Sequence, residues 1–257
     1  MLKKIITISS IILMAIGLLA LIGFSYQLRS NEYINEVIIN IDKNNHVGFL
    51  QEEEIIQLVN RKDTLLTYKM VDLDKKSIEN KLKKVAFIEK VDCYGGLNGG
   101  LFITIKERNP VVRVYEKSNK SYYIDEQGYF FPVKKHNAPR VIIANGYFKE
   151  NRSEEADNIY DSIYAQSPLK ELFRLVMKIR SDEFLNAQIS QIYYNSRGDW
   201  ELVPEMGGHI IKLGQLDNLD EKLENLTAFY HDLSQHNGWD NYKIINLTFN
   251  NQIVCTK

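Results

Sequence analysis

Cysteine and histidine are scarce and scattered in this sequence. Its 257 residues include two cysteines, Cys93 and Cys255, and five histidines. No HExxH or CxxC spacing supplies the ligands of a zinc site, and no GxSxG motif supplies a serine nucleophile. We therefore predict no catalytic, cofactor or metal site, and we expect the cysteines to be two separate buried thiols. The histidines are expected to be solvated surface residues: His46, His136, His209, His231 and His236.

An excess of charge of either sign is also missing. The chain has 32 Lys and Arg residues against 33 Asp and Glu residues, a formal net charge of −1. Because basic and acidic residues are mixed along the chain, no basic stripe is available to neutralise phosphates, and nucleic acid is not an expected partner. No small-molecule substrate is indicated either. The five prolines, 15 tyrosines and 11 phenylalanines predict a strand-rich, well-ordered globular part.

Residues 5–24 form an apolar run that contains no charge. At about 1.5 Å per residue, this run is long enough to cross a hydrocarbon core of roughly 30 Å. Lys3 and Lys4 precede it, so the cationic excess predicts that residues 1–4 stay in the cytoplasm. The alternative is a cleaved signal peptide, which the length of the run and its poor cleavage site disfavour. We predict a single-pass anchor in the inner membrane, with the bulk of the chain in the periplasm.

The pattern of residues 35–107 predicts a strand, two helices and two further strands, in that order. Apolar residues alternate with polar neighbours in residues 37–41, and they recur at helical spacing in residues 52–59 and 74–85. Residues 87–107 return to the alternation of strands on both sides of a glycine-rich loop.

That loop contains Gly95, Gly96, Gly99 and Gly100. Residues 96–99 match the GxxG of an RNA-binding KH loop, and a glycine-rich loop can also cradle a phosphate, but both functions require a helix after the loop. A strand pattern follows here instead. We therefore predict a hairpin whose glycines are structural.

The rest of the chain, residues 108–257, predicts a mostly antiparallel β domain with flanking helices. Ser167 and Pro168 mark the start of a helix as N-cap and first helical residue, and Asp74 caps the second helix of the preceding region. Three strand patterns and a last helix follow: residues 189–195, 199–203, 209–213 and 219–233. A coiled-coil seam is the alternative reading of the last helix, but its apolar pattern covers only about two heptads.

The order of elements in residues 35–107 resembles a POTRA domain, a small module that docks polypeptides near membranes. Three downstream segments are similar to FtsQ/DivIB cell-division proteins, and to their Bacteroidota-like branch in particular. Residues 107–112, ERNPVV, resemble the step that leaves the POTRA domain, and residues 123–131, YIDEQGYFF, resemble a hairpin of that family. Residues 244–255, IINLTFNNQIVC, resemble its closing strand.

The resemblance implies an α+β protein with four parts: residues 1–4 in the cytoplasm, a transmembrane helix at 5–24, a POTRA-type β-α-α-β-β domain at 35–107, and a β domain at 108–257. It also implies a non-catalytic bitopic scaffold of the division machinery, concentrated at the division septum, which links septal proteins and docks FtsB- and FtsL-type partners. The alternative function is a POTRA-containing factor that docks translocated or outer-membrane polypeptides.

The closing strand is the candidate docking element. Its alternation predicts that Ile245, Leu247, Phe249 and Ile253 face the core. At a sheet edge its main-chain groups would pair with an incoming strand, although it is also possible to read it as a strand that merely closes the sheet. Asn246 and Thr248 stand where the family usually has Asp and Arg. The candidate partner-binding residues are Asn246, Thr248, Phe249, Asn250, Asn251, Gln252 and Val254.

Overall fold

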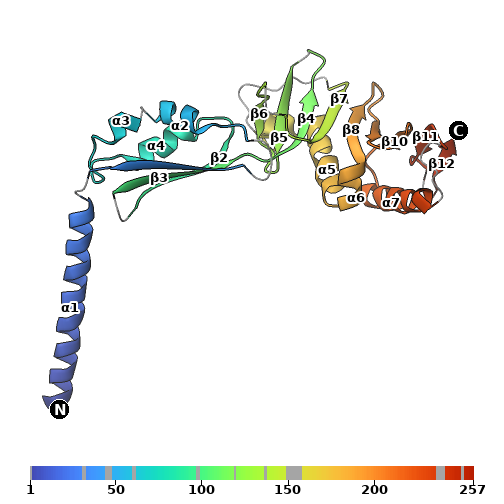
Figure 1. Cartoon of the computed structure of the whole chain (residues 1–257). Helices are drawn as coiled ribbons and strands as arrows, with labels where there is room; N and C mark the ends of the chain where they lie inside the picture. Colours follow the sequence, from blue (N-terminus) through green and yellow to red (C-terminus); the bar gives the residue numbers. More distant parts are fainter. Residues whose placement is uncertain are drawn as a thin grey trace. The chain divides into compact units, whose positions relative to one another are not determined.

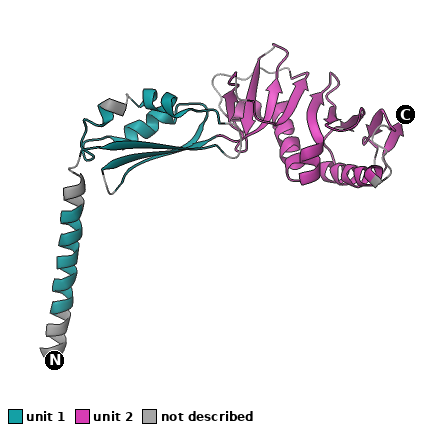
Figure 2. Cartoon of the chain, viewed as in Figure 1, with its two compact units in different colours: residues 1–107 teal, residues 108–257 magenta. Residues whose placement is uncertain are grey.

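The computed structural model describes all but a few short stretches of the chain. It divides the chain into two compact units, residues 1–107 and residues 108–257 (Figure 2). The residues outside the description are 1, 31–32, 44–47, 60–61, 97–98, 119, 136–137, 149–157, 236–240 and 250–251, together with the side chains of 2–8, 26–30, 62–63 and 235.

Unit 1 begins with helix α1 (Leu2–Ser30). The apolar side chains described in residues 9–25 are exposed to solvent, with exposed fractions such as 79 % for Met14 and 69 % for Leu21. Within the described part of the chain, no helix reaches the length and apolar content that a membrane crossing requires. The transmembrane anchor therefore stays a prediction from the sequence.

A three-stranded sheet covered by helices forms the rest of unit 1 (Figure 1). Strand β3 is central, with β1 parallel to it on one side and β2 antiparallel on the other. The predicted order of elements is confirmed, and the structure adds the short helix α3. The elements are β1 (Glu36–Asp42), α2 (Glu52–Leu58), α3 (Lys62–Leu65), α4 (Lys75–Leu82), β2 (Ile88–Gly95) and β3 (Gly100–Glu107).

Carboxylate side chains accept main-chain hydrogen bonds at the start of α4 and at the end of β3 in unit 1. The prediction that Asp74 caps α4 is confirmed, because its Oδ1 accepts a hydrogen bond from the Ser77 amide at 2.9 Å. Glu107 is fully buried at the end of β3, and its two carboxylate oxygens accept the amides of Phe49 and Leu50 at 2.9 and 2.7 Å. The loop that leads into α2 is thereby tied to the last strand of the sheet.

The glycines of the β2–β3 hairpin allow the turn conformation and leave room for an aromatic ring. Gly99 has a φ of +74°, a backbone conformation that residues other than glycine rarely adopt. A Cβ on Gly96 would stand 2.4 Å from the Phe102 ring, and this ring stacks on Tyr94 with centroids 5.3 Å apart. Strand β3 follows directly, so the hairpin prediction is confirmed, and the loop lacks the following helix that a KH or phosphate site needs.

Unit 2 is built on one nine-stranded sheet with the order β12-β11-β10-β9-β8-β7-β4-β5-β6 (Figure 1). Three of its pairings are parallel, namely β4–β7, β7–β8 and β10–β11, and the other five are antiparallel. The strands are β4 (Pro110–Tyr115), β5 (Ser121–Asp125), β6 (Phe130–Pro132), β7 (Ile142–Gly146), β8 (Ile189–Tyr194), β9 (Trp200–Pro204), β10 (Ile210–Gly214), β11 (Ile244–Asn246) and β12 (Val254–Thr256).

Helices supply the crossover connections of two of the three parallel pairs, β7–β8 and β10–β11, whereas β4 and β7 are connected through β5 and β6. Parallel strands cannot be joined by a tight turn. The chain passes from β7 to β8 through η1 (Ser162–Tyr164), α5 (Pro168–Arg180) and α6 (Glu183–Gln188), and from β10 to β11 through α7 (Leu219–Gln235). The predicted start of α5 is confirmed, since the Ser167 hydroxyl accepts the Leu169 amide at 3.1 Å and Pro168 is the first helical residue.

Two of the motifs that resemble FtsQ/DivIB proteins meet in unit 2. The fully buried Asp125 carboxylate forms an ion pair with Arg108 at 2.7 Å. It also accepts hydrogen bonds from the amides of Gln127 and Tyr129 at 3.0 and 2.8 Å. Gly128 completes the turn with a φ of +85°. Burial raises the pKa of Asp125, while the Arg108 guanidinium and the two amides act against this rise. The hairpin that the resemblance implies for residues 123–131 is therefore confirmed, with Asp125 and Gly128 in the β5–β6 turn.

The positive φ of Gly99 leads to a stability prediction. Gly99→Val is expected to lower the free energy of unfolding of unit 1 by about 1–3 kcal/mol, because a branched side chain is strained in this region of φ and ψ. A Cβ at this position would also lie 3.1 Å from the Tyr33 carbonyl oxygen. Urea unfolding, monitored through hydrogen exchange of the β2 and β3 amides, measures the loss of stability. Gly99→Asn is the control, with a smaller loss expected; a valine variant as stable as the wild type would contradict the structural role.

Candidate docking edge at the C-terminus

The predicted closing strand of residues 244–255 is broken in the structure. It forms two three-residue strands, β11 and β12, which pair antiparallel with Ile245 opposite Cys255 and Asn246 opposite Val254. The expectation of one continuous strand is therefore wrong. Asn250 and Asn251, two of the candidate partner-binding residues, lie outside the described residues.

Strand β11 is fixed in the sheet by its parallel partner β10. The Leu247 amide donates to the Lys212 carbonyl at 2.8 Å, and the Ile210 amide donates to the Lys243 carbonyl at 2.9 Å. Ile245 and Leu247 are 0 % and 3 % exposed and belong to the main core cluster of unit 2, as predicted. The inner strand of the hairpin is thus anchored by both main-chain bonds and apolar burial.

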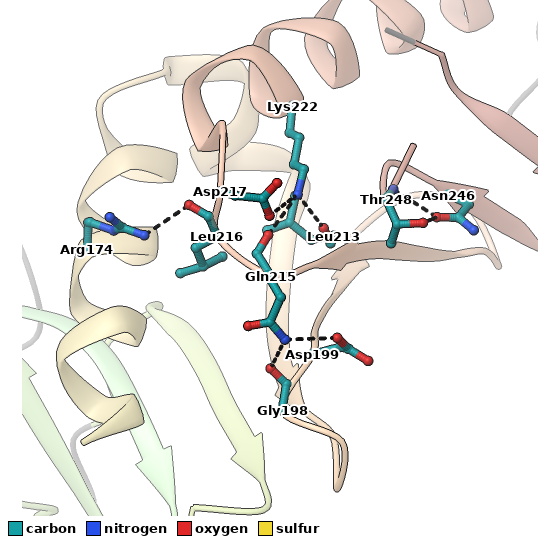
Figure 3. Close-up of polar contacts among 10 residues, drawn as sticks. All are labelled: Arg174, Gly198, Asp199, Leu213, Gln215, Leu216, Asp217, Lys222, Asn246 and Thr248. Atoms are coloured by element: carbon teal, nitrogen blue, oxygen red, sulfur yellow. Dashed lines mark hydrogen bonds and ion pairs between the residues drawn. The ribbon is translucent and has the colours of Figure 1, made fainter. Parts of the chain in front are cut away.

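Asn246 and Thr248 explain why the strand ends where it does. The Asn246 Oδ1 accepts hydrogen bonds from the Thr248 amide at 3.0 Å and from the Thr248 hydroxyl at 2.7 Å (Figure 3). This side-chain bond replaces a ladder bond and turns the chain away from the sheet. The Thr248 methyl group also fills the space beside Gly214, where a Cβ would come within 2.8 Å of it.

A buried lysine holds the loop that lies beside this turn. Lys222 of α7 is only 8 % exposed. Its Nζ donates to the carbonyl oxygens of Leu213 and Gln215 at 3.2 and 2.8 Å and to the Asp217 carboxylate at 3.0 Å (Figure 3). The hydrogen bond from Lys222 lowers the pKa of Asp217. All three protons of the ammonium group thus have an acceptor, and the end of β10 is bound to the start of α7.

Two further polar side chains extend this network. Gln215 Nε2 donates to the Gly198 carbonyl at 2.8 Å and to the Asp199 carboxylate at 3.1 Å, which ties the loop to the β8–β9 turn. Arg174 of α5 donates to the Leu216 carbonyl at 3.1 Å. Figure 3 shows these bonds converging on the loop between β10 and α7 from neighbouring elements.

Strand β12 forms one edge of the nine-stranded sheet. In the part of the chain that the structure describes, β11 is the only strand that pairs with it. The Val254 side chain is 41 % exposed, Thr256 is exposed, and Cys255 is partly buried against the core cluster. Main-chain groups on the outer side of β12 therefore face away from the sheet, which is the geometry that strand addition uses.

The candidate residues of the connecting segment lie beside α7. Phe249 is 48 % exposed, so the prediction that it faces the core is wrong. It lines a shallow groove together with Gln252, Leu247 and Ile253, and residues of α7 form the other wall. The structure thus brings Phe249 and Gln252 together on one surface and engages Asn246 and Thr248 in the turn, while Val254 lies on the edge strand.

The comparison with known families covers most of the chain. The family model described as FtsQ/DivIB, C-terminal related, matches residues 109–256, more than half of the chain. The chain belongs to this FtsQ/DivIB family. A POTRA-like domain model matches residues 32–106, and none of the curated proteins matches the chain.

Both matches agree with a scaffold role in division. FtsQ/DivIB and POTRA-like domains are generally non-catalytic and serve protein–protein interaction, and the FtsQ/DivIB family acts at the division site. The match over residues 109–256 favours this role over that of a general POTRA-containing factor. In the described part of the FtsQ/DivIB chain, no group of three or more potential metal ligands is found.

Two expectations about single residues need correction or completion. His209 is 2 % exposed, and its Nε2 lies 2.6 Å from the Tyr230 hydroxyl, so the prediction of a solvated residue is wrong for it. His231 is exposed, and the other three histidines lie outside the described residues. Both cysteines are free thiols, as expected, but Cys255 is only partly buried.

Lys222 is the structural residue that the sequence analysis missed. It follows Leu219 by three positions and precedes Leu226 by four, so helical spacing places it on the core-facing stripe of α7. A lysine in that stripe is the signal that would have identified it. Buried lysines require acceptors, and the adjacent loop provides them.

The Lys222 network predicts a large effect of a conservative apolar substitution. Lys222→Met is expected to lower the free energy of unfolding of unit 2 by about 2–4 kcal/mol, because two carbonyl groups and a carboxylate lose their donor. Fluorescence of the fully buried Trp200 follows this unfolding in urea. Lys178→Met is the matched control: Lys178 pairs with Asp220 at 2.5 Å, but both side chains are well exposed, so the loss of stability should be much smaller than for Lys222→Met. Equal losses in the two variants would refute the anchoring role.

Proposed function

We propose that this FtsQ/DivIB protein is a bitopic scaffold of the bacterial division machinery that captures FtsB- and FtsL-type partners on the outer edge of β12. The observation that carries the proposal is the position of β12 as the last strand of the sheet. The half-exposed Phe249 and the exposed Gln252 beside this strand offer side-chain contacts to a strand that pairs there.

Main-chain pairing fits the composition of this edge. β12 and the segment before it, residues 248–256, contain no charged residue. A partner held by main-chain hydrogen bonds needs an accessible, correctly oriented strand more than it needs particular side chains. The network around Lys222 supports this role, because it holds the elements against which β11, and through it β12, is paired.

A pair of proline variants tests the docking edge. The Thr256 carbonyl accepts the Lys243 amide at 2.8 Å, so the main-chain groups of Thr256, and of Val254 two residues before it, face β11, whereas the Cys255 amide faces outward. Cys255→Pro therefore removes an outward donor, and Val254→Pro removes a bond to β11. We expect Cys255→Pro to keep a near-normal melting temperature, since edge strands tolerate proline, and to lose co-purification with FtsB- and FtsL-type proteins from mildly solubilised membranes. Val254→Ala is the control and should retain both, because the exposed Val254 side chain contributes less than about 1 kcal/mol.

Hydrogen exchange of the wild-type protein provides an independent measurement. Bound partner should slow exchange of the residue 254–256 amides. Normal partner capture by both proline variants at wild-type stability, or unchanged exchange in this strand when the partner is bound, would move the interface elsewhere.

The proposed scaffold is anchored by residues 5–24, with residues 1–4 in the cytoplasm and the POTRA-like domain and unit 2 in the periplasm. Support comes from the absence of charge in this run, from Lys3 and Lys4 before it, and from the exposed apolar side chains described in α1. A cleaved signal peptide would leave the same periplasmic units without an anchor.

Reporter fusions and proteolysis test this topology. A reporter that is active only outside the cytoplasm, fused after Lys257, should be active because the cationic N-terminus remains inside. Protease added to spheroplasts should remove the residues beyond about residue 30, while the anchor stays in the membrane fraction at its full mass. Full protection from the protease would overturn the topology, and loss of residues 1–24 from the mature protein would indicate a cleaved signal.

A further inference from the structure

Exposed apolar side chains of unit 1 gather at one end of its sheet. Beyond α1, the large apolar side chains that are exposed in the described part of the unit are Tyr33, Leu58, Tyr68, Val71 and Tyr94. Leu58 ends α2. The other four lie on segments that meet where the chain enters the sheet (Figure 1).

Main-chain contacts join these segments. Tyr33 forms an isolated antiparallel bridge with Lys69, and the Ile34 amide donates to the Tyr68 carbonyl at 3.0 Å. The Asn35 amide donates to the Gly99 carbonyl at 3.1 Å, which adds the tip of the β2–β3 hairpin to the same end.

Side-chain contacts complete this end of the sheet. Met70 packs against Gly95, next to Tyr94, so closely that a Cβ on Gly95 would lie 2.7 Å from the Met70 sulfur. We call Tyr33, Tyr68 and Tyr94 the tyrosine collar. Their exposed fractions are 62 %, 45 % and 51 %.

The chemistry of the collar suits a lipid headgroup layer. Tyrosine rings are enriched where hydrocarbon meets water, because the ring is apolar and the hydroxyl is polar. The Lys69 ammonium lies 5.8 Å from the centre of the Tyr33 ring. A lysine stem along an aromatic surface, with its charge directed to phosphate, is the arrangement that membrane interfaces favour.

The length of α1 keeps the collar within reach of the headgroup layer. If residues 5–24 span the hydrocarbon core, the six helical residues 25–30 extend about 9 Å beyond it. The headgroup layer is roughly 5–7 Å thick on each side. Tyr33 follows Ser30 by three residues, a stretch of at most about 11 Å, so the chain is long enough for the collar to reach back to the headgroup layer.

We propose that the tyrosine collar rests in the outer headgroup layer of the membrane and holds this end of the POTRA-like domain against the lipid surface. This inference rests on the proposed anchor at residues 5–24. A lipid surface is the occupant that the anchor delivers to the collar through covalent connection, without any additional partner.

Fluorescence quenching in proteoliposomes tests the collar. Full-length variants Tyr33→Trp, Tyr68→Trp and Tyr94→Trp are reconstituted into phosphatidylethanolamine and phosphatidylglycerol vesicles, with or without lipids brominated near the headgroup end of the acyl chain. Tyr160→Trp is the matched control, because Tyr160 is 63 % exposed but lies in unit 2. Subtracting the wild-type emission removes the contribution of the two native tryptophans.

Brominated lipid is expected to quench about half of the added emission of the collar variants and to leave that of Tyr160→Trp nearly unchanged. Phe24→Trp, together with flotation of the vesicles after alkaline carbonate, reports the anchor separately. Quenching of Phe24→Trp without quenching at the collar would overturn the collar alone. Protein that leaves the vesicles in carbonate would overturn the anchor, and the collar with it.

Discussion

The ammonium group of Lys222 fixes the local geometry on which the C-terminal edge depends. Burying a lysine carries a desolvation penalty, which here is offset by two carbonyl acceptors and the Asp217 carboxylate. The lowered pKa of Asp217 means that this pairing contributes stability at pH values above the ordinary pKa of aspartate. That contribution is lost only as the pH falls through the lowered pKa, so the loop is held at neutral pH.

The edge itself is built from very short strands, and this is consistent with a docking role. β11 and β12 have three residues each. Short edge strands protect a sheet from unspecific pairing, because they present few main-chain groups at a time. An incoming strand that pairs with β12 would lengthen the sheet and stabilise a segment that is otherwise held by few bonds, which places recognition at the low-stability end of unit 2.

Local signals in the sequence predicted local structure well. The caps at Asp74 and Ser167 and the turns at Gly99 and Gly128 each depend on a side chain or a φ angle within a few residues. The parallel pairings of unit 2 depend instead on which strands meet after a long crossover, and alternation along one strand carries no information about that.

At the candidate docking edge, too, the sequence predicted the locally determined features and missed the others. Ile245 and Leu247 follow the alternation and are buried, but Asn246 bonds to Thr248 and ends the strand. Beyond that turn, the period of two no longer applies, and Phe249 is half exposed rather than buried. His209 was equally unpredictable, because its partner Tyr230 is 21 positions away in the sequence.

The residues that carry the family resemblance have a different role from those of the proposed docking edge. Glu107, Arg108 and Asp125 are bound within their own units by buried carboxylate contacts, so the motifs that contain them report the fold. Asn246 and Thr248 depart from the family pattern, yet they bond to each other and leave the pairing of β12 intact. Because strand addition relies on main-chain groups, such departures are compatible with a docking edge. The sequence of a partner would then adapt to the side chains around β12, while the strand geometry stays the same.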